Sequence, residues 1–343
     1  MPSSRHRPDA VRARRVLAVA AIAVAVAQLA AGLALDTAPA RVRFAQGARV
    51  LDQARALGGA PYVLLLGSSR FWQLDADPAA VALRETVGGD GPGLLKGAMP
   101  AGDPIVADYL LERLLAEGSH PRLIALEISP EIIANPSRWV AEHAVRFFTW
   151  RDVAVWTPEI VRAGKTRQVA AARFAPIHLY RRELLTWITG VQPPYLRVAA
   201  AVQAAAAAPA DHDGAGPNAV TLFGLRETRK WLRRYRVDGG AARALERLLA
   251  RCHDAGIRVA LVGVPVSSWV RELYTPEIER TFGAYIDRVS RRYGAEFVDY
   301  RAKVPDRFFR DHHHLNRRGS ELFVRLLVAE VLAPRWSASA AAS

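Results

Sequence analysis

Short apolar runs alternate with longer amphipathic stretches along most of the chain. The apolar runs have the length of buried strands, and they lie at Tyr62–Leu66, Arg122–Glu127, Ile257–Gly263 and Glu296–Asp299, with a weaker fifth at Gly93–Lys96. Helical periodicity fills the intervals, most clearly at Ala107–Glu117, Ala241–Ala255 and Pro276–Tyr293. This alternation predicts an α/β fold, a doubly wound parallel five-stranded sheet covered by helices on both faces.

One longer apolar stretch precedes this pattern. Val16–Leu35 contains Gln28 as its only strongly polar residue, and a helix of this length spans roughly the 30 Å hydrocarbon core of a bilayer. Arginines dominate the flank before it, so the positive-inside rule predicts a single-pass anchor in the inner (cytoplasmic) membrane, with the following domain periplasmic or extracellular. A cleaved signal peptide is the alternative, because Ala38-Pro39-Ala40 loosely resembles a cleavage site. We favour the anchor, since the apolar stretch is longer than a usual signal peptide's apolar region.

The strand pattern stops between Asn135 and Val237. Helical stretches at Val153–Ala163 and Tyr180–Ile188, the alanine-rich Val198–Ala210 and the loop Asp211–Asn218 replace it. Five of the eight tryptophans lie here, and they either dock these helices on the body, which we favour, or line a glycan-binding cleft. The expected organisation is a cytoplasmic basic tail (1–15), the anchor (16–35), a linker with a helix (36–60), the α/β domain (61–135 and 237–335), a helical insertion (136–236) and a disordered tail (336–343).

Composition narrows the class of protein further. The single cysteine, Cys252, excludes an internal disulfide or a thiolate cluster, and we expect it to be a small buried side chain. The net charge of +14 includes +4 from the first fifteen residues, and the other arginines are scattered without a nucleic-acid motif. We therefore expect attraction to an anionic surface or polymer and no nucleic-acid partner.

The first candidate for chemistry directly follows the first predicted strand. Gly67-Ser68-Ser69-Arg70 breaks that strand and opens toward a helix, so that a serine lies at the carboxyl edge of the sheet, where doubly wound folds bind their ligands. Amides at the start of the helix can stabilise negative charge beside it. The alternative is a serine that only caps the helix.

The second candidate is the run from Asp311 to Asn316 before the last apolar helix, Glu321–Leu332. A carboxylate three residues before His314 can accept its Nδ1–H and leave Nε2 to take a proton from the hydroxyl of Ser69. Three alternatives remain: Asn316 simply caps the helix, the histidines His312 to His314 bind a metal, or the run is a solvated loop.

Together these two blocks resemble the SGNH (GDSL-type) hydrolase superfamily, from Tyr62 to about Leu332 without the insertion. The resemblance implies that Ser69 is the nucleophile, His314 the base and Asp311 its partner, with Ser68 in place of the usual aspartate. It also nominates the amides of Ser69 and Gly102 for the oxyanion hole, and it implies no cofactor and no metal. The third block departs from the pattern, because Glu127-Ile128-Ser129-Pro130-Glu131 lacks the usual asparagine.

The departing third block, the Gly-Ser-Ser-Arg block and the anchor look like the membrane-anchored branch of that superfamily. This branch includes the D-alanyl transfer protein of teichoic-acid modification and the alginate-type O-acetyltransferases. The resemblance implies O-acyl, most simply O-acetyl, transfer to an envelope polysaccharide, or ester hydrolysis, with a membrane-bound O-acyltransferase as a possible partner. A non-catalytic protein that binds or scaffolds the polymer is the alternative, since the asparagine is missing, and a metal-dependent hydrolase comes third.

Overall fold

Five parallel strands form the centre of the molecule. The computed structural model describes residues 7–37, 44–88, 91–134, 147–190 and 219–340. The strands are β1 (Tyr62–Leu66), β2 (Gly93–Lys96), β3 (Leu123–Ile128), β4 (Arg258–Gly263) and β5 (Glu296–Asp299). Their order is β2-β1-β3-β4-β5, and each neighbouring pair is parallel. This is the order of flavodoxin-like doubly wound sheets, so the predicted α/β class is confirmed.

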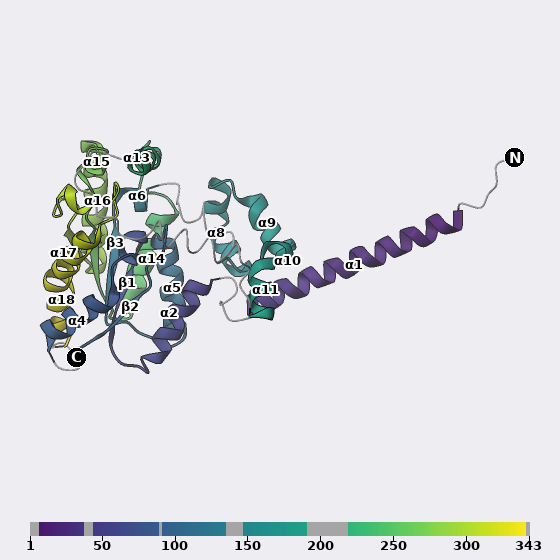
Figure 1. Ribbon diagram of the computed structural model, residues 1–343, viewed down its shortest axis with the longest axis horizontal. Coiled ribbons are helices and arrows are strands. Elements are labelled where there is room, and N and C mark those ends of the chain that lie inside the picture. Colours follow the sequence, from purple (N-terminus) through teal and green to yellow (C-terminus); the bar gives the residue numbers. More distant parts are fainter. Residues whose placement is uncertain (1–6, 38–43, 89–90, 135–146, 191–218, 341–343) are drawn as a thin grey trace.

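Helices cover both faces of the sheet (Figure 1). One layer consists of α2 (Ala45–Ala56), α5 (Pro104–Ala116), α14 (Gly240–Asp254) and α16 (Pro276–Tyr293). The other consists of α3 (Ser69–Trp72), α4 (Ala76–Val87), α17 (Arg317–Leu327), the π-helical Val328–Leu332 and α18 (Ala333–Ala340). Because successive strand residues point to opposite faces, β1 sends Leu64 and Leu66 into the first core and Val63 and Leu65 into the second. Cys252 of α14 is buried in the first core, as expected.

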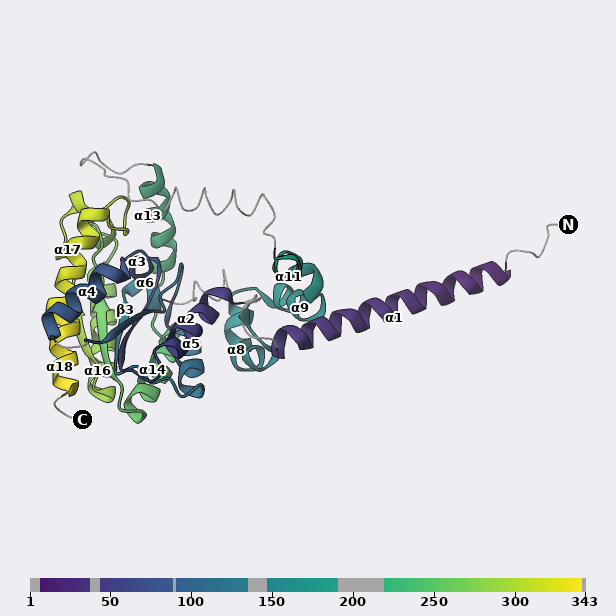
Figure 2. The same ribbon diagram turned by 60° about the horizontal axis from the view of Figure 1, so that its bottom comes forward.

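The helical insertion divides into two parts. Helix α6 (Pro130–Ile133) precedes the insertion. The first part of the insertion comprises α8 (Trp150–Arg162), α9 (Thr166–Phe174), α10 (Pro176–Leu179) and α11 (Arg181–Thr189), and Trp156 and Ile160 of α8 pack against α5. Its second part, α13 (Ala219–Leu232), lies over the sheet, well away from α11 (Figure 2). The alanine-rich segment Val198–Ala210 and the loop Asp211–Asn218 lie outside the described residues.

The N-terminal helix α1 (Arg7–Thr37) projects from the rest of the molecule (Figure 1). Its stretch Ala10–Asp36 contains an 18-residue segment with a mean hydropathy of 2.4 and is long enough to cross a membrane. The apolar helix expected at Val16–Leu35 is therefore present. Length and composition alone fit an anchor and a signal sequence equally.

The C-terminal end departs from the expectation of a disordered tail beginning at residue 336. Helix α18 continues to Ala340, and Trp336 is buried in the second core with Arg122 over its ring. The prediction of a disordered tail fails because residues 336–340 are mostly small, a composition that suggested disorder. The burial of the large Trp336 side chain is enough to hold the helix against the core. Residues 341–343 lie outside the described chain.

Candidate active site

Ser69 is the first residue of α3, immediately after β1. Ser68 caps this short helix, with its side chain accepting the Arg70 amide, and Ser69 itself is half-buried at the carboxyl edge of the sheet. Gly67 has a φ of 158°, and the side chain of Glu127 occupies the space into which any Cβ at this position would project. A glycine is thus required for β1 to turn so closely over β3.

The histidine run forms a turn organised by Asp311. Its Oδ1 accepts the backbone N–H groups of His313 (3.0 Å) and His314 (2.8 Å), which is the local hydrogen bonding that aspartate favours in turns. Asn316 caps α17 by accepting the Gly319 amide at 2.9 Å. The capping role left open for Asn316 is therefore real, and it helps to fix the position of the turn.

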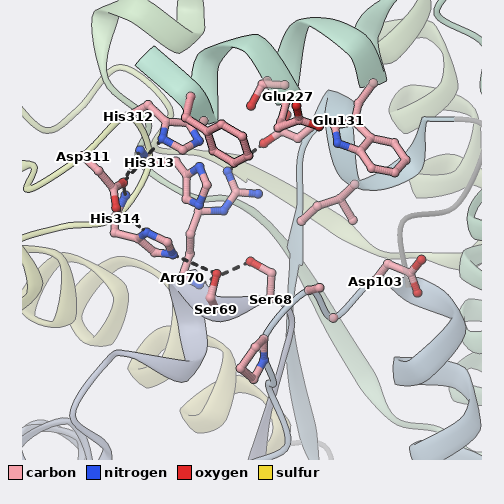
Figure 3. Close-up of a pocket in the computed structure, with 18 of the residues that line it drawn as sticks. Ser68, Ser69, Arg70, Asp103, Glu131, Glu227, Asp311, His312, His313 and His314 are labelled. Carbon is pink, nitrogen blue, oxygen red and sulfur yellow. Dashed lines mark hydrogen bonds and ion pairs between the residues drawn. The ribbon is translucent and has the colours of Figure 1, made fainter. Parts of the chain in front are cut away.

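The turn aligns three side chains in a hydrogen-bonded line (Figure 3). His314 Nδ1 lies 2.7 Å from Asp311 Oδ2, and His314 Nε2 lies 2.9 Å from Ser69 Oγ. With Nδ1–H donating to the carboxylate, Nε2 is the acceptor for the serine hydroxyl. The structure thus brings together Ser69, His314 and Asp311, the three side chains singled out from the sequence.

The carboxylate of Asp311 is held in its charged form. Burial alone would raise its pKa, but the hydrogen bond and charge of His314 and the two amides of the turn outweigh burial and lower the pKa to about 2. Asp311 is therefore an acceptor for the ring of His314 throughout the neutral range.

A buried acid beneath the serines was not identified from the sequence. Glu127, at the end of β3, is 1% exposed and accepts the amide of Ser68 (2.7 Å), the hydroxyl of Ser68 (2.6 Å) and Nε–H of Arg70 (2.6 Å). The first loop of the site is therefore fastened to the neighbouring strand. The only sequence signal was an acid inside an apolar strand, which by itself does not say what it binds.

Arg70 connects this acid to the rest of the third block. Its Nη1 donates to Glu131 at 2.8 Å and its Nη2 to Ser129 at 2.8 Å, while Tyr274 donates to Glu131 at 2.7 Å. Burial opposes the charge of Glu131, but the guanidinium and the tyrosine hydroxyl together lower its pKa. The segment Glu127–Glu131, which contains no asparagine, supplies the acceptors that position a buried arginine.

The oxyanion assignment is met in part. Among the described residues the Ser69 amide donates no hydrogen bond, so it is available to a developing oxyanion beside Oγ. The Gly102 amide is instead donated to Met99 O at 2.9 Å, closing a turn in which Ala101 has a φ of 53°. In this structure the Gly102 amide is therefore engaged in the turn, and its role as an oxyanion donor stays a prediction. Gly102 serves close packing, since a Cβ there would collide with Gly67 O.

A pocket of about 470 Å³ opens above Ser69, and the insertion forms its roof (Figure 3). Its floor and walls include Ser69, Arg70, Gly102 and the histidine turn, and α13 contributes Val220, Phe223, Gly224, Glu227, Thr228 and Trp231. The sequence did not predict that α13 would lie above Ser69, because nothing in the chain between α6 and α13 indicates where it packs against the α/β domain. Of the insertion's tryptophans, Trp156 packs in the core between α8 and α5, Trp231 lines this pocket, and Trp139 lies outside the described residues.

His312 is fixed beneath this roof rather than facing Ser69. Its ring fills the space in front of Gly224, where a Cβ would collide with the imidazole. Burial lowers the pKa of His312 to about 4, so the ring is neutral at pH 7. Ser267 donates its hydroxyl to the His312 carbonyl at 2.7 Å, which fixes the backbone of the turn as well.

The geometry of the histidine turn also bears on the alternative that these histidines bind a metal. Asp311, His312 and His313 place one ligand atom each within 4.8 Å of one another. Both oxygens of Asp311 already accept hydrogen bonds that build the turn and orient His314, so a metal here would compete with them. The arrangement of the described residues fits an acid–base pair better than a metal centre.

Comparison with protein-family models finds no match, and comparison with curated proteins finds none either. Among solved structures the chain is similar to a lipase/acylhydrolase from Enterococcus faecalis, at 14% identity over 79% of this chain and 95% of that chain, with a TM-score of 0.36. It is similar to the psychrotrophic esterase EstA from Pseudoalteromonas sp. at 11% identity, over 80% and 97%, with a TM-score of 0.36. AlinE4, an SGNH-hydrolase family esterase, has 14% identity over 80% and 97%, with a TM-score of 0.34. Because these identities and TM-scores are low, the function is inferred from the site itself.

Proposed function

We propose that this protein is a membrane-anchored SGNH-type serine acyltransferase or esterase that acts on an envelope or extracellular polysaccharide. The observation that carries the proposal is the line from Asp311 through His314 to Ser69, with hydrogen-bond distances of 2.7 and 2.9 Å, at the floor of a pocket. A hydroxyl, an imidazole and a buried carboxylate in this order are the parts required for nucleophilic acyl transfer.

The chemistry follows from these positions. Ser69 Oγ attacks the acyl carbonyl while its proton passes to His314 Nε2, and the imidazolium that forms is stabilised by Asp311. When the tetrahedral intermediate collapses, His314 returns the proton to the departing alcohol oxygen and the acyl group stays on Ser69. A sugar hydroxyl, or water, then gives its proton to His314 and attacks the acyl carbon. When this second intermediate collapses, His314 passes the proton to Ser69 Oγ and the ester, or the acid, is released.

The negative oxygen of the intermediate requires donors. The Ser69 amide is one, and Arg70 is our candidate for the donor that replaces the missing asparagine. Three of the five N–H groups of Arg70 are donated, to Glu127, Glu131 and Ser129, and its side chain lines the pocket. One oxyanion donor stabilises the transition state by about 3 kcal/mol, so the presence of a second donor has a large effect on the rate of acyl transfer.

A glycan acceptor fits the roof and the charge of the molecule. Trp231 offers an apolar face, and Glu131, Glu227 and Asp103 bring carboxylates to the same pocket, a combination that suits sugar rings and hydroxyls. Residues 1–15 carry +4 of the net charge of +14, and the remaining +10 favours association with an anionic polymer. An acyl donor supplied by a membrane-bound O-acyltransferase is part of this proposal, because an anchored acceptor enzyme works at the same membrane.

The contacts of α1 favour an anchor that stays on the protein. Gln28 Oε1 accepts the Ile177 amide at 3.0 Å, and Asp36 forms an ion pair with Arg173 at 2.8 Å. The Arg173 side chain is 2% exposed, so cleavage after Ala40 would remove the partner of a buried cation. Cleavage would also remove the contacts of α1 with α9 and α10, so an ion pair and its packing would be lost together, which favours retention over removal.

The second candidate, a polymer-binding protein without catalysis, is favoured by one observation: the Gly102 amide is donated to Met99 and leaves the backbone part of the oxyanion hole with the Ser69 amide alone. Both candidates use the same pocket. They differ in whether Ser69 forms a covalent intermediate.

Acyl transfer can be measured with the full-length protein in detergent, p-nitrophenyl acetate as donor and envelope oligosaccharides as acceptors. We expect release of nitrophenol together with acetylated oligosaccharide detected by mass spectrometry, both lost in Ser69→Ala. Ser337→Ala is the control, because Ser337 is exposed on α18, far from α13 (Figure 1), and it should behave like the wild type. Oligosaccharide binding without turnover, unchanged in Ser69→Ala, would favour the polymer-binding candidate. Activity lost in chelator and restored by a metal would favour the metal-dependent one.

A further inference from the structure

The outer third of α1 is packed against the first part of the insertion, in both views of the molecule (Figures 1 and 2). Besides the bond from Ile177 to Gln28 and the ion pair of Asp36 with Arg173, Pro176 lies in van der Waals range of the position a side chain would take at Gly32. Helices α9 and α10 are therefore attached to the same helix that is apolar enough to span a membrane.

The depth of these contacts follows from helix geometry. The arginine-rich flank ends at Arg15, so the hydrocarbon core begins near Val16 and extends to about Leu35, close to Asp36. Gln28 lies eight residues before Asp36, which at about 1.5 Å per residue places it roughly 12 Å inside the outer boundary for an upright helix. A backbone amide of α10 that binds Gln28 is then below the level of the outer headgroups.

The surface around this attachment is apolar where a water-soluble domain would be polar. Exposed fractions are 64% for Phe174, 50% for Leu185 and 72% for Ile188, and Ile177 and Trp150 are also exposed, with the Trp150 ring against Phe174. Exposed apolar clusters of this kind in water mark interaction surfaces. A tryptophan and a phenylalanine at the edge of a bilayer are typical of interfacial anchoring.

Basic residues border the apolar ones. Arg167 of α9 and Arg181 and Arg182 of α11 are exposed. Arginine stems can lie along apolar surface while the guanidinium reaches lipid phosphates. The combination of bulky apolar and arginine side chains fits a lipid interface better than it fits a second copy of the chain.

We propose that helices α9 to α11 form a membrane-contacting surface, made by Phe174, Ile177, Leu185 and Ile188, which enters the outer leaflet beside α1. The partner is the phospholipid bilayer itself. This inference rests on the proposed anchor, and it adds that the anchor is not a flexible tether: the insertion holds α1 and the bilayer in a fixed relation to the rest of the chain.

The test uses the full-length protein in nanodiscs that contain lipids with brominated acyl chains. An environment-sensitive fluorophore is attached at Ile188→Cys, at Ile22→Cys within α1, and at Val81→Cys on α4, which is exposed and far from α1 (Figure 1). The native Cys252 does not interfere, because it is buried and burial raises the pKa of its thiol to about 12.

We expect the Ile188→Cys fluorophore to be quenched by the lipids roughly threefold more strongly than the Val81→Cys fluorophore, and to be shielded from iodide in water. Quenching at Ile22→Cys with none at Ile188→Cys would overturn the membrane-contacting surface while leaving the anchor in place. Shielding of Ile188→Cys from both lipid and iodide would overturn it in favour of a protein partner. Absence of quenching at Ile22→Cys as well would overturn the anchor itself, which distinguishes the two failures.

Discussion

Three consecutive histidines stand at the candidate active site, and their side chains have different surroundings. His314 lies between Asp311 and Ser69, whereas the ring of His312 is packed beneath Gly224. The order within the turn could be predicted from sequence, because Asp311 and His314 are only three residues apart. The partner of Ser68 could not, because Glu127 is distant in the chain and meets it only through strand pairing.

His314→Ala should be nearly as damaging to acyl transfer as Ser69→Ala. Loss of a base aligned on the nucleophile costs roughly 10²–10⁴-fold, and members of one catalytic unit are not additive, so the double variant should be little worse than either single variant. His312→Ala and His313→Ala should retain most activity. Initial rates with p-nitrophenyl acetate test this, and additive losses, or a larger loss in His312→Ala than in His314→Ala, would contradict the assignment.

Glu127→Gln should loosen the loop that carries the nucleophile. The amide cannot replace a charged acceptor of three hydrogen bonds, and breaking a buried pair with Arg70 costs about 3–5 kcal/mol. We expect a matching fall in the free energy of unfolding and a slower acylation of Ser69 well below the unfolding temperature. The control is Glu117→Gln, which breaks an exposed pair with Arg55 and should cost about 1 kcal/mol or less. Equal effects of the two substitutions would contradict a special role for Glu127.

At the scale of elements, strands were easier to predict than helix ends. The runs at β1, β2 and β5 match the structure residue for residue. A proline precedes and a glycine follows both β1 and β2, and Gly294 ends the helix just before β5. Helix α5 begins at Pro104 rather than Ala107, since Asp103 caps it by accepting the Ile105 and Val106 amides. A capping residue of this kind extends the helix by about one turn beyond the segment in which apolar residues recur with helical spacing.

Contact between α13 and the histidine turn predicts how stability depends on pH. His312 is buried, and burial lowers its pKa to about 4; Asp311 and Glu131 raise the pKa, and His314 and Arg70 lower it further. Between pH 6.5 and 4 the unfolded chain binds a proton at this residue that the folded chain excludes, so the free energy of unfolding falls as pH falls through that window. At pH 5 the loss amounts to about 2 kcal/mol, and it levels off below pH 4.

His312→Gln should remove this dependence. Urea unfolding of the full-length protein in detergent, followed by tryptophan fluorescence at pH 7 and pH 5, measures it. His253→Gln, at an exposed position of α14, should keep the wild-type difference between the two pH values. Asp311 adds nothing to this window, because its pKa of about 2 removes its contribution only below about pH 4. An unchanged difference in His312→Gln would contradict the buried neutral ring.

At the scale of the whole molecule, the sequence predicted the doubly wound sheet and the apolar N-terminal helix but not how the insertion connects them. Helix α13 returns over the sheet to roof the pocket, and α10 holds α1, yet neither contact has a local signal in the chain. The first contact depends on Gly224, whose lack of a side chain admits the His312 ring, and the second uses Gln28 and Asp36. The partners of all three are far away in sequence.

Retention of α1 is a prediction at this scale. The full-length protein should sediment with inner membranes and keep residues 1–35, because Asp36 is needed by the buried Arg173. N-terminal sequencing of the protein from membrane and soluble fractions measures this. A mature N-terminus near Arg41 in the soluble periplasmic fraction would show a cleaved signal sequence instead.

Covalent labelling shows whether Ser69 is the nucleophile of this site. The full-length protein is treated with a fluorophosphonate and the adduct is mapped by peptide mass spectrometry, in the wild type, Ser69→Ala, Ser68→Ala and His314→Ala. We expect one adduct, on Ser69, absent in Ser69→Ala, still measurable in Ser68→Ala, and formed about 10²–10⁴-fold more slowly in His314→Ala. An unlabelled wild-type protein, or an adduct that survives Ser69→Ala and disappears with Ser68→Ala, would contradict this assignment.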